Sequence, residues 1–262
     1  MVMLAEIPKV NLLGIDVHKM WMQEVIGLVE QRIEERRPLL LGVVNVAKLV
    51  NSRKNSQLKA SVADADVVLA DGAGVVWLSR WTGDPLPERI AGIDVMYRLF
   101  ERADEKHYRV YFLGAKPKVV QEVVAYVERK YPGVQVAGFR DGYFKEEESA
   151  DVAEAIRESK ADILFVAMTS PKKENFLSRW SSTMDVPICH GVGGSFDVVA
   201  GVVKRAPLWM QRLGLEWLFR VMQEPRRMWK RYLVTNSIFI WLAIKEVVRM
   251  RLKANKRLDV SQ

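Results

Sequence analysis

The chain has few of the side chains that bind transition metals or form disulfides. Among its 262 residues are one cysteine, Cys189, and three histidines, His18, His107 and His190. A single cysteine excludes a disulfide framework and a cysteine-built zinc site, and no two histidines have the spacing of helical metal ligands. The first 30 residues mix acidic with apolar residues, which is not the pattern of a secretory signal. We therefore expect a cytoplasmic protein without a bound metal.

Long hydrophobic runs are also missing, and the positive charge is concentrated at one end. Residues 204–257 hold fourteen Lys or Arg against three acidic residues, whereas the whole chain has a net charge of +8, so the remainder is slightly acidic. This basic tail also carries four of the eight tryptophans. Its charge-free stretch, 232–244, is shorter than the ~20 apolar residues that cross a bilayer.

The tail predicts an amphipathic element that lies on an anionic membrane surface. Two alternatives stay open: a helix that packs on the protein or forms a homo-oligomer, and a nucleic-acid-binding helix. Nucleic acid is disfavoured because the tail is as hydrophobic as it is basic and carries no recognition motif. We divide the chain into a domain over 1–203 and a helical appendage over 204–262.

From residue 39 to 200, short β-branched runs alternate with longer amphipathic stretches, which predicts an α/β fold. Parallel strands buried on both faces have this nearly continuous apolar character. The candidate strands are Leu39–Val44, Val67–Ala70, Arg109–Leu113, Val134–Phe139, Ile163–Ala167 and Pro187–His190. Between two of them, 118–130 has helical periodicity and ends at Pro132-Gly133. The pattern favours an open, mostly parallel sheet with helices on both faces.

Ligands of such a sheet bind beyond the carboxyl ends of its strands, so the residues that follow each strand are candidates for the site. Asp71 follows an apolar run and precedes a glycine and a helix, where a carboxylate can serve as a general base. A helix N-cap needs the same residue type at the same position, and this alternative stays open. Asp64 and Asp66 imitate a metal-binding pair but precede the strand, at the opposite edge of the sheet.

A glycine-rich turn, 191–195, connects the last strand to a helix. Backbone amides in such a turn can hold a diphosphate, although the turn matches neither G-x-G-x-x-G nor a P-loop, and a tightly packed turn is the alternative. His190 and Cys189, which lie just before it, are interpreted as core residues.

Several motifs together resemble the WecG/TagA/CpsF family. The resemblance covers about residues 10 to 235. It rests on Asn45, Ala70-Asp71-Gly72, Gly74-Val75, Glu88-Arg89, Gly92-Ile93-Asp94, Phe112-Leu113-Gly114, Ser170-Pro171 with Glu174, the segment 191–197 (GVGGSFD), Ala200-Gly201, Arg205-Ala206-Pro207, Trp209, Gly214-Leu215-Glu216-Trp217, Arg220, Glu224-Pro225-Arg226-Arg227 and Arg231-Tyr232.

The resemblance implies an inverting, metal-independent glycosyltransferase with a Rossmann-like fold and no cofactor. Such enzymes transfer a hexose, typically N-acetylmannosamine, from a UDP-sugar to an undecaprenyl-diphosphate-linked saccharide on the cytoplasmic membrane face. It also implies roles for individual residues. Asp71 matches the base, with Asn45 beside it, and the residues implied to bind substrate are Gly114, Lys173, Gly193, Gly194, Asp197, Arg220, Arg227 and Arg231.

The chain departs from the family pattern at two positions. Val43 stands where the family often has threonine, and Lys173 stands where it has glutamine. Both positions belong to motifs that would contact donor or acceptor, so the donor sugar stays open. Two other functions also stay open: a membrane-associated scaffold that binds sugar nucleotide or lipid diphosphate without catalysis, and a nucleotide-dependent oxidoreductase, which the missing G-x-G-x-x-G disfavours.

Overall fold

A computed structural model describes residues 4–260, and it places all their side chains except those of Ala5, Arg227, Arg231 and residues 251–260. Its centre is a six-stranded sheet in which every pairing is parallel, with strand order β4-β3-β8-β7-β5-β6. The strands are β3 (Leu39–Val44), β4 (Val67–Ala70), β5 (Arg109–Gly114), β6 (Gln135–Arg140), β7 (Ile163–Ala167) and β8 (Ile188–Gly191). The predicted α/β class, the six strands and their parallel arrangement are confirmed to within one residue at each end.

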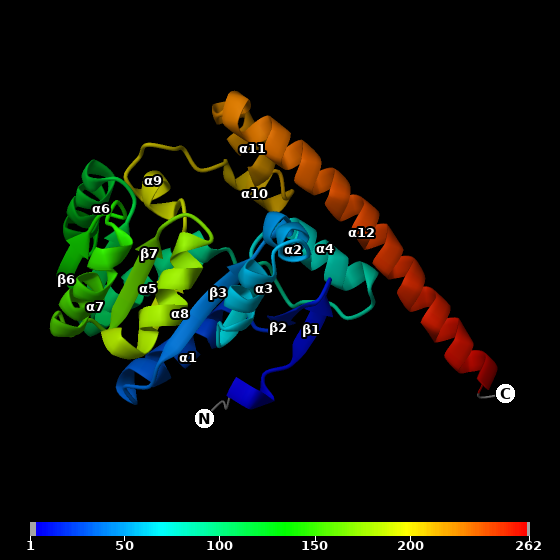
Figure 1. The fold of residues 1–262 in the computed structure, drawn as a ribbon, viewed down its shortest axis with the longest axis horizontal. Helices are drawn as coiled ribbons and strands as arrows, with labels where there is room; N and C mark the ends of the chain where they lie inside the picture. Colours follow the sequence, from blue (N-terminus) through cyan, green and yellow to red (C-terminus); the bar gives the residue numbers. More distant parts are fainter. Residues whose placement is uncertain (1–3, 261–262) are drawn as a thin grey trace.

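Helices cover both faces of this sheet (Figure 1). One buried cluster joins the sheet to α1 (Met22–Glu34), α5 (Gly92–Lys106), α6 (Pro117–Lys130) and α9 (Ser195–Val199). On the opposite face, α7 (Ser149–Glu158) and α8 (Lys172–Met184) pack on β5, β7 and β8. The predicted helix at 118–130 is α6, which has Pro117 in its first turn, where a missing N–H costs nothing. Short 3₁₀ turns occupy Leu4–Glu6 and Glu146–Glu148.

A β-hairpin near the N-terminus was not predicted. Strand β1 (Lys9–Leu12) pairs antiparallel with β2 (Ile15–His18) through a turn in which Gly14 has φ of 89°. The hairpin is attached to the sheet through His18, whose Nδ1 accepts a hydrogen bond of 3.0 Å from the Val68 amide of β4. Burial lowers the pKa of His18 to about 4, and Lys9 lowers it further, so the ring is neutral at pH 7.

As far as residue 260, the C-terminal appendage contains three helices that pack beside the β4 edge of the sheet. These are α10 (Leu208–Arg212), α11 (Glu216–Gln223) and α12 (Pro225–Val260). Phe239, Leu242 and Ala243 of α12 belong to a buried cluster with residues of β1, β2, α2 (Val46–Ser52), α3 (Ser56–Ala63) and α4 (Ala73–Trp81). At its C-terminal end α12 extends well beyond the rest of the molecule (Figure 1).

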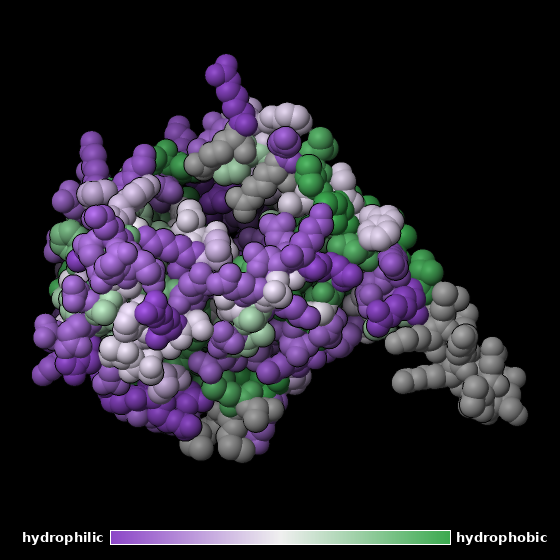
Figure 2. All heavy atoms as spheres, viewed as in Figure 1, coloured by the Kyte–Doolittle hydropathy of each residue, from purple (hydrophilic) through white to green (hydrophobic). Residues whose placement is uncertain are grey.

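One side of α12 carries exposed apolar side chains. Leu233, Ile240, Trp241, Ile244 and Val248 recur at helical spacing, and Trp241 and Ile244 are each 60% exposed. Figure 2 shows apolar residues gathered along this helix. Among the helices that the structure describes, none is long and apolar enough to cross a membrane.

Candidate active site

Asp71 lies at the carboxyl end of β4, as the sequence predicts. Its backbone amide donates a hydrogen bond of 2.8 Å to the carbonyl of Val44 at the end of β3, which fixes Asp71 beside the neighbouring strand. The next helix, α4, begins at Ala73 and has Gly72 as its N-cap, with φ of 106°. The alternative interpretation of Asp71 as a helix N-cap is therefore wrong. Asp71 as a whole residue is partly exposed, and its carboxylate does not cap α4.

The surroundings of Asp71 favour its neutral form more than water does. Burial raises the pKa of Asp71 to about 6, and the negative charge of Glu216 adds to the rise. The positive charges of Arg89, Arg220 and Lys48 act in the opposite direction. A carboxylate with a pKa near 6 is mostly ionised at pH 7 and is a stronger base than an ordinary aspartate, which suits proton abstraction.

Asn45 follows β3 and caps the helix that comes next. Its Oδ1 accepts a hydrogen bond of 3.0 Å from the Lys48 amide, which makes Asn45 the N-cap of α2. The Val44–Asp71 hydrogen bond places Asn45 and Asp71 at adjacent strand ends. The two residues predicted for catalysis are therefore neighbours.

The glycine-rich turn lies under a guanidinium group of the appendage. The turn runs from the end of β8 to the start of α9, and Gly193 adopts φ of 55°. A Cβ atom built on Gly194 would lie 3.6 Å from Nη2 of Arg220 and 3.9 Å from Oδ2 of Asp197. Arg220 comes from α11 and also influences the pKa of Asp71. One arginine therefore connects the turn and the proposed base.

Lys173 belongs to a buried group of charges beside the turn. Its side chain lies against Gly191, and its Nζ is 3.5 Å from Oε1 of Glu174, which is 3.1 Å from Nζ of Lys48. Lys173 is only 7% exposed, and burial lowers its pKa to about 8, with Lys48 acting in the same direction. Burial raises the pKa of Glu174, but Lys173 and Lys48 outweigh it, so the net pKa is lowered and the carboxylate is ionised.

The remaining predicted substrate-binding residues have different surroundings. Gly114 has φ of 121°, and a Cβ atom on it would lie 2.5 Å from the carbonyl of Ala167. This close approach of β5 to β7 is sufficient to require glycine there. The backbones of Arg227 and Arg231 lie in α12, but their side chains are outside the described part of the structure.

Asp64 and Asp66 lie at the amino edge of the sheet, as predicted. Asp66 accepts a hydrogen bond from the Leu40 amide and Asp64 accepts one from the Ser178 hydroxyl. Within the described side chains, no three His, Cys, Asp or Glu residues are placed to hold a metal ion. A groove of about 700 Å³ between α3 and α8 has Asp64 in its wall but touches none of the predicted site residues.

His190 and Cys189 are core residues, as predicted. His190 has no exposed surface, and its ring contacts two carbonyl oxygens, of Leu41 at 3.3 Å and of Gly92 at 3.0 Å. Burial lowers the pKa of His190 to about 4, so the ring is neutral and donates to only one of the two.

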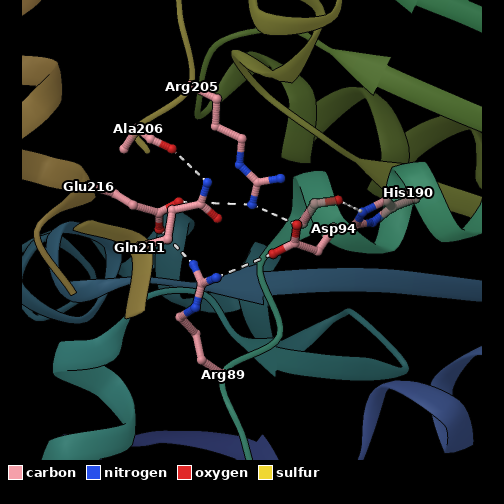
Figure 3. A network of polar contacts seen from close by, with 8 residues as sticks. Arg89, Asp94, His190, Arg205, Ala206, Gln211 and Glu216 are labelled. Carbon is pink, nitrogen blue, oxygen red and sulfur yellow. Dashed lines mark hydrogen bonds and ion pairs between the residues drawn. The ribbon is translucent and has the colours of Figure 1, made fainter. Parts of the chain in front are cut away.

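A network of ion pairs that the sequence analysis missed joins the appendage to the segment at the start of α5 (Figure 3). Arg89 contacts Glu216 at 2.6 Å and Asp94 at 3.4 Å, and Arg205 contacts Asp94 at 2.6 Å. Arg89 and Asp94 flank the start of α5, whereas Arg205 and Glu216 belong to the appendage. All four residues belong to segments that carry the family resemblance. No local sequence pattern, however, indicates which residues more than 100 positions apart are in contact.

Comparisons with known proteins find similar sequences over most of the chain. Residues 10–253 match the family model described as "Glycosyl transferase WecG/TagA/CpsF family". Two relatives are named N-acetylglucosaminyldiphosphoundecaprenol N-acetyl-beta-D-mannosaminyltransferase. The one from Bacillus spizizenii is 41% identical over 180 residues, 69% of each chain. The one from Bacillus subtilis is 36% identical over 206 residues, 79% of each chain.

Proposed function

Because the chain belongs to the WecG/TagA/CpsF family of glycosyltransferases, we propose that it transfers a hexose from a UDP-sugar to an undecaprenyl-diphosphate-linked saccharide. The names of the two relatives suggest an acceptor that carries N-acetylglucosamine and a donor that carries N-acetylmannosamine. The observation that carries the proposal is the meeting of Asp71, Arg220 and the Gly194 turn at one edge of the sheet.

The proposed reaction is a single displacement. Asp71 takes the proton of an acceptor hydroxyl while that oxygen attacks the anomeric carbon from the face opposite the nucleotide. The bond from the anomeric carbon to the diphosphate oxygen breaks, and UDP leaves with the bonding electrons. One new glycosidic bond forms with inverted configuration, and the proton remains on Asp71 until it passes to solvent. Asn45 lies next to this base and can contact the sugar or acceptor.

Negative charge develops on the departing diphosphate, and a cationic group must stabilise it. Arg220 stands over Gly194, whose turn supplies backbone amides, so the diphosphate would lie between the turn and the guanidinium. Arg227 and Arg231 belong to the same appendage and would add charge. We propose that these groups make a metal or cofactor unnecessary.

We also propose that the appendage holds the enzyme on the inner face of the cytoplasmic membrane, where a lipid-linked acceptor would be found. The exposed side of α12 combines Trp241 and Ile244 with basic residues such as Lys245 and Arg249. Apolar side chains flanked by cations suit an interface with anionic lipid. Binding at such a surface would bring the site to the acceptor.

A donor screen tests the activity. Purified protein with detergent-solubilised undecaprenyl-diphosphate-N-acetylglucosamine is incubated with a panel of UDP-sugars, and both UDP and the lipid product are measured. We expect transfer from at least one UDP-hexose, with a product of inverted anomeric configuration by NMR. If the protein binds UDP but transfers no sugar to lipid-linked acceptors of any length, the result would instead support a membrane-associated scaffold without catalytic activity.

A further inference from the structure

The four residues that join the appendage to the sheet domain form one connected group, which we call the docking network. Its members are Arg89, Asp94, Arg205 and Glu216. Arg89 and Asp94 come from the sheet domain, and Arg205 and Glu216 come from the appendage, so every inter-domain contact pairs opposite charges (Figure 3). All four side chains are between one fifth and one third exposed. Partial burial makes these pairs stronger than pairs at an open surface.

Both ends of the docking network are attached to the site. Next to Arg89, the Ile90 amide donates a hydrogen bond of 2.9 Å to the carbonyl of Ala70, the residue before Asp71. On the appendage side, Glu216 opens α11 and Arg220 lies four residues later, on the same side of that helix. Fixing Glu216 on Arg89 therefore also fixes Arg220 relative to Asp71 and the Gly194 turn.

Other contacts hold the appendage side together. The Gln223 side chain makes two hydrogen bonds with the backbone of Lys204, of 3.0 and 2.9 Å, so the end of α11 is attached to the linker that follows α9. Gln211 donates to the carbonyl of Ala206 at 2.7 Å. The contact of Arg205 with Glu216, at 3.9 Å, therefore lies within a segment held together by several hydrogen bonds.

We propose that the docking network is a positioning lock, which brings Arg220 over the Gly194 turn and Glu216 toward Asp71 only when the appendage is seated. The inference rests on the proposed function, because it assigns to Asp71 the role of base. Arg89, Asp94, Arg205 and Glu216 are positioning residues, since each acts through the site rather than on the sugar. A sheet domain whose appendage has moved away would lack its diphosphate-binding arginine and transfer slowly.

The lock also changes the charge around the base. The charged groups that face Asp71 are Glu216 and Arg220 of α11, Arg89 before α5, Lys48 of α2 and Lys173 of α8. Of these, Glu216 is the one carboxylate that raises the pKa of Asp71. Removing its charge should shift the acidic limb of the pH–rate profile to lower pH, an effect that a loss of rigidity alone would not produce.

The test compares Glu216→Gln, Arg89→Gln and the double variant in the full-length protein. We expect each single change to lower kcat/KM for the UDP-sugar about ten-fold, the scale of a lost charge-assisted hydrogen bond. The double variant should lose little more than the worse single variant, because each change alone already breaks the Arg89–Glu216 ion pair. Multiplicative losses in the double variant would overturn the lock.

Two further variants test docking without removing the charge of Glu216. Arg205→Gln should increase cleavage of residues 200–207 by a non-specific protease and lower turnover, because it removes the ion pair with Asp94. Glu246→Gln is the matched control, because Glu246 lies on α12 and pairs with Arg249 in its own helix. The proposal would be contradicted if the acidic limb of the pH–rate profile stayed at its wild-type pH in Glu216→Gln. It would also be contradicted if Arg205→Gln were cleaved at the wild-type rate. If Asp71→Asn retains full turnover, the assignment of the base fails, whereas the proteolysis and double-variant results still test the lock.

Discussion

The amide nitrogen of Asp71 lies 2.8 Å from the carbonyl oxygen of Val44, so the ends of two parallel strands are joined where the carboxylate projects. This bond places the proposed base beside Asn45. We expect Asp71→Asn to lower turnover by roughly 10²–10⁴-fold, the usual effect of losing a general base. Steady-state kinetics with UDP-sugar and lipid acceptor measure the loss, and calorimetry should find donor binding largely kept. Near-normal turnover would remove Asp71 from this role.

The pH dependence of wild-type turnover should reflect the same carboxylate. Because the pKa of Asp71 is about 6, and the base must be ionised, kcat/KM should rise with pH and level off above about 7. An aspartate with an ordinary pKa would place the acidic limb of this pH–rate profile near pH 4. A profile flat between pH 5 and 7 would contradict the proposed environment of Asp71.

Asp71 should also lower the stability of the folded protein at neutral pH. The folded state retains the proton of Asp71 up to about pH 6, whereas the unfolded chain releases it near 3.8. Stability is therefore lost as pH rises from about 4 to 6, and Asp71→Asn avoids this loss. We expect the variant to be more stable by roughly 1–3 kcal/mol at pH 7.5, by the conversion of about 1.4 kcal/mol per pH unit. Denaturant titration at pH 7.5 and pH 4 measures this, and most of the difference should be gone at pH 4.

The central strands were predictable because each is a short apolar run that is followed by glycine or polar residues. The same logic located Asp71 and the Gly193–Gly194 turn, since strand ends in a parallel sheet meet at one edge. The hairpin formed by β1 and β2 has a comparable signal, with Val10, Leu12, Ile15 and Val17 alternating around Gly14, and it could have been found.

The docking network could not have been found in the same way. Arg89 and Glu216 are 127 residues apart. The sequence pattern around each residue predicts its own helix or loop but not its distant partner. Their pairing depends on how α11 packs beside the start of α5, which is decided by tertiary contacts. Lys173 illustrates the same limit: the sequence identifies it as a departure from the family, but its pairing with Glu174 appears only in the fold.

Lys173→Gln tests whether this departure sets the donor preference. At pH 7 Lys173 is mostly a buried cation, and the glutamine restores the residue that the family pattern has at this position. We expect the variant to use UDP-N-acetylmannosamine more efficiently, relative to other UDP-hexoses, than the wild type does. Because the pKa of Lys173 is about 8, the wild-type preference should also change between pH 7 and 9, and this change should be absent from the variant.

A neighbouring lysine provides the control for this prediction. Lys172 donates hydrogen bonds to the carbonyls of Gly142 and Phe144 and does not pair with Glu174 in the described structure. Lys172→Gln should leave the order of donor preference unchanged. An equal shift in both variants would mean that α8 was disturbed as a whole, and that Lys173 has no specific role in donor choice.

The membrane contribution of α12 can be separated from catalysis. Trp241→Ala with Ile244→Ala removes two side chains that are each 60% exposed and lie on the apolar side of the helix. We expect binding to anionic liposomes, measured by co-sedimentation, to fall about ten-fold or more, since each large apolar side chain contributes about 1.5–3 kcal/mol when buried. Turnover with acceptor in detergent should be kept. Trp21→Ala is the matched control, because Trp21 is 53% exposed outside the appendage.

Gly214 connects α10 to α11 and tests how closely the appendage must approach α4. Its φ is 70°, and a Cβ atom would lie 2.5 Å from Cβ of Ala73 and 3.3 Å from the Trp77 ring. Gly201 has φ of 73°, but a Cβ atom there would meet no atom within 4 Å. Gly201→Ala therefore introduces the backbone strain alone, about 1 kcal/mol, whereas Gly214→Ala adds a clash that pushes α11 from the sheet domain. We expect Gly214→Ala to lower kcat/KM at least ten-fold more than Gly201→Ala does, because Arg220 moves with α11. Equal effects of the two substitutions on turnover and melting temperature would mean that the approach of α11 to α4 is not needed for catalysis.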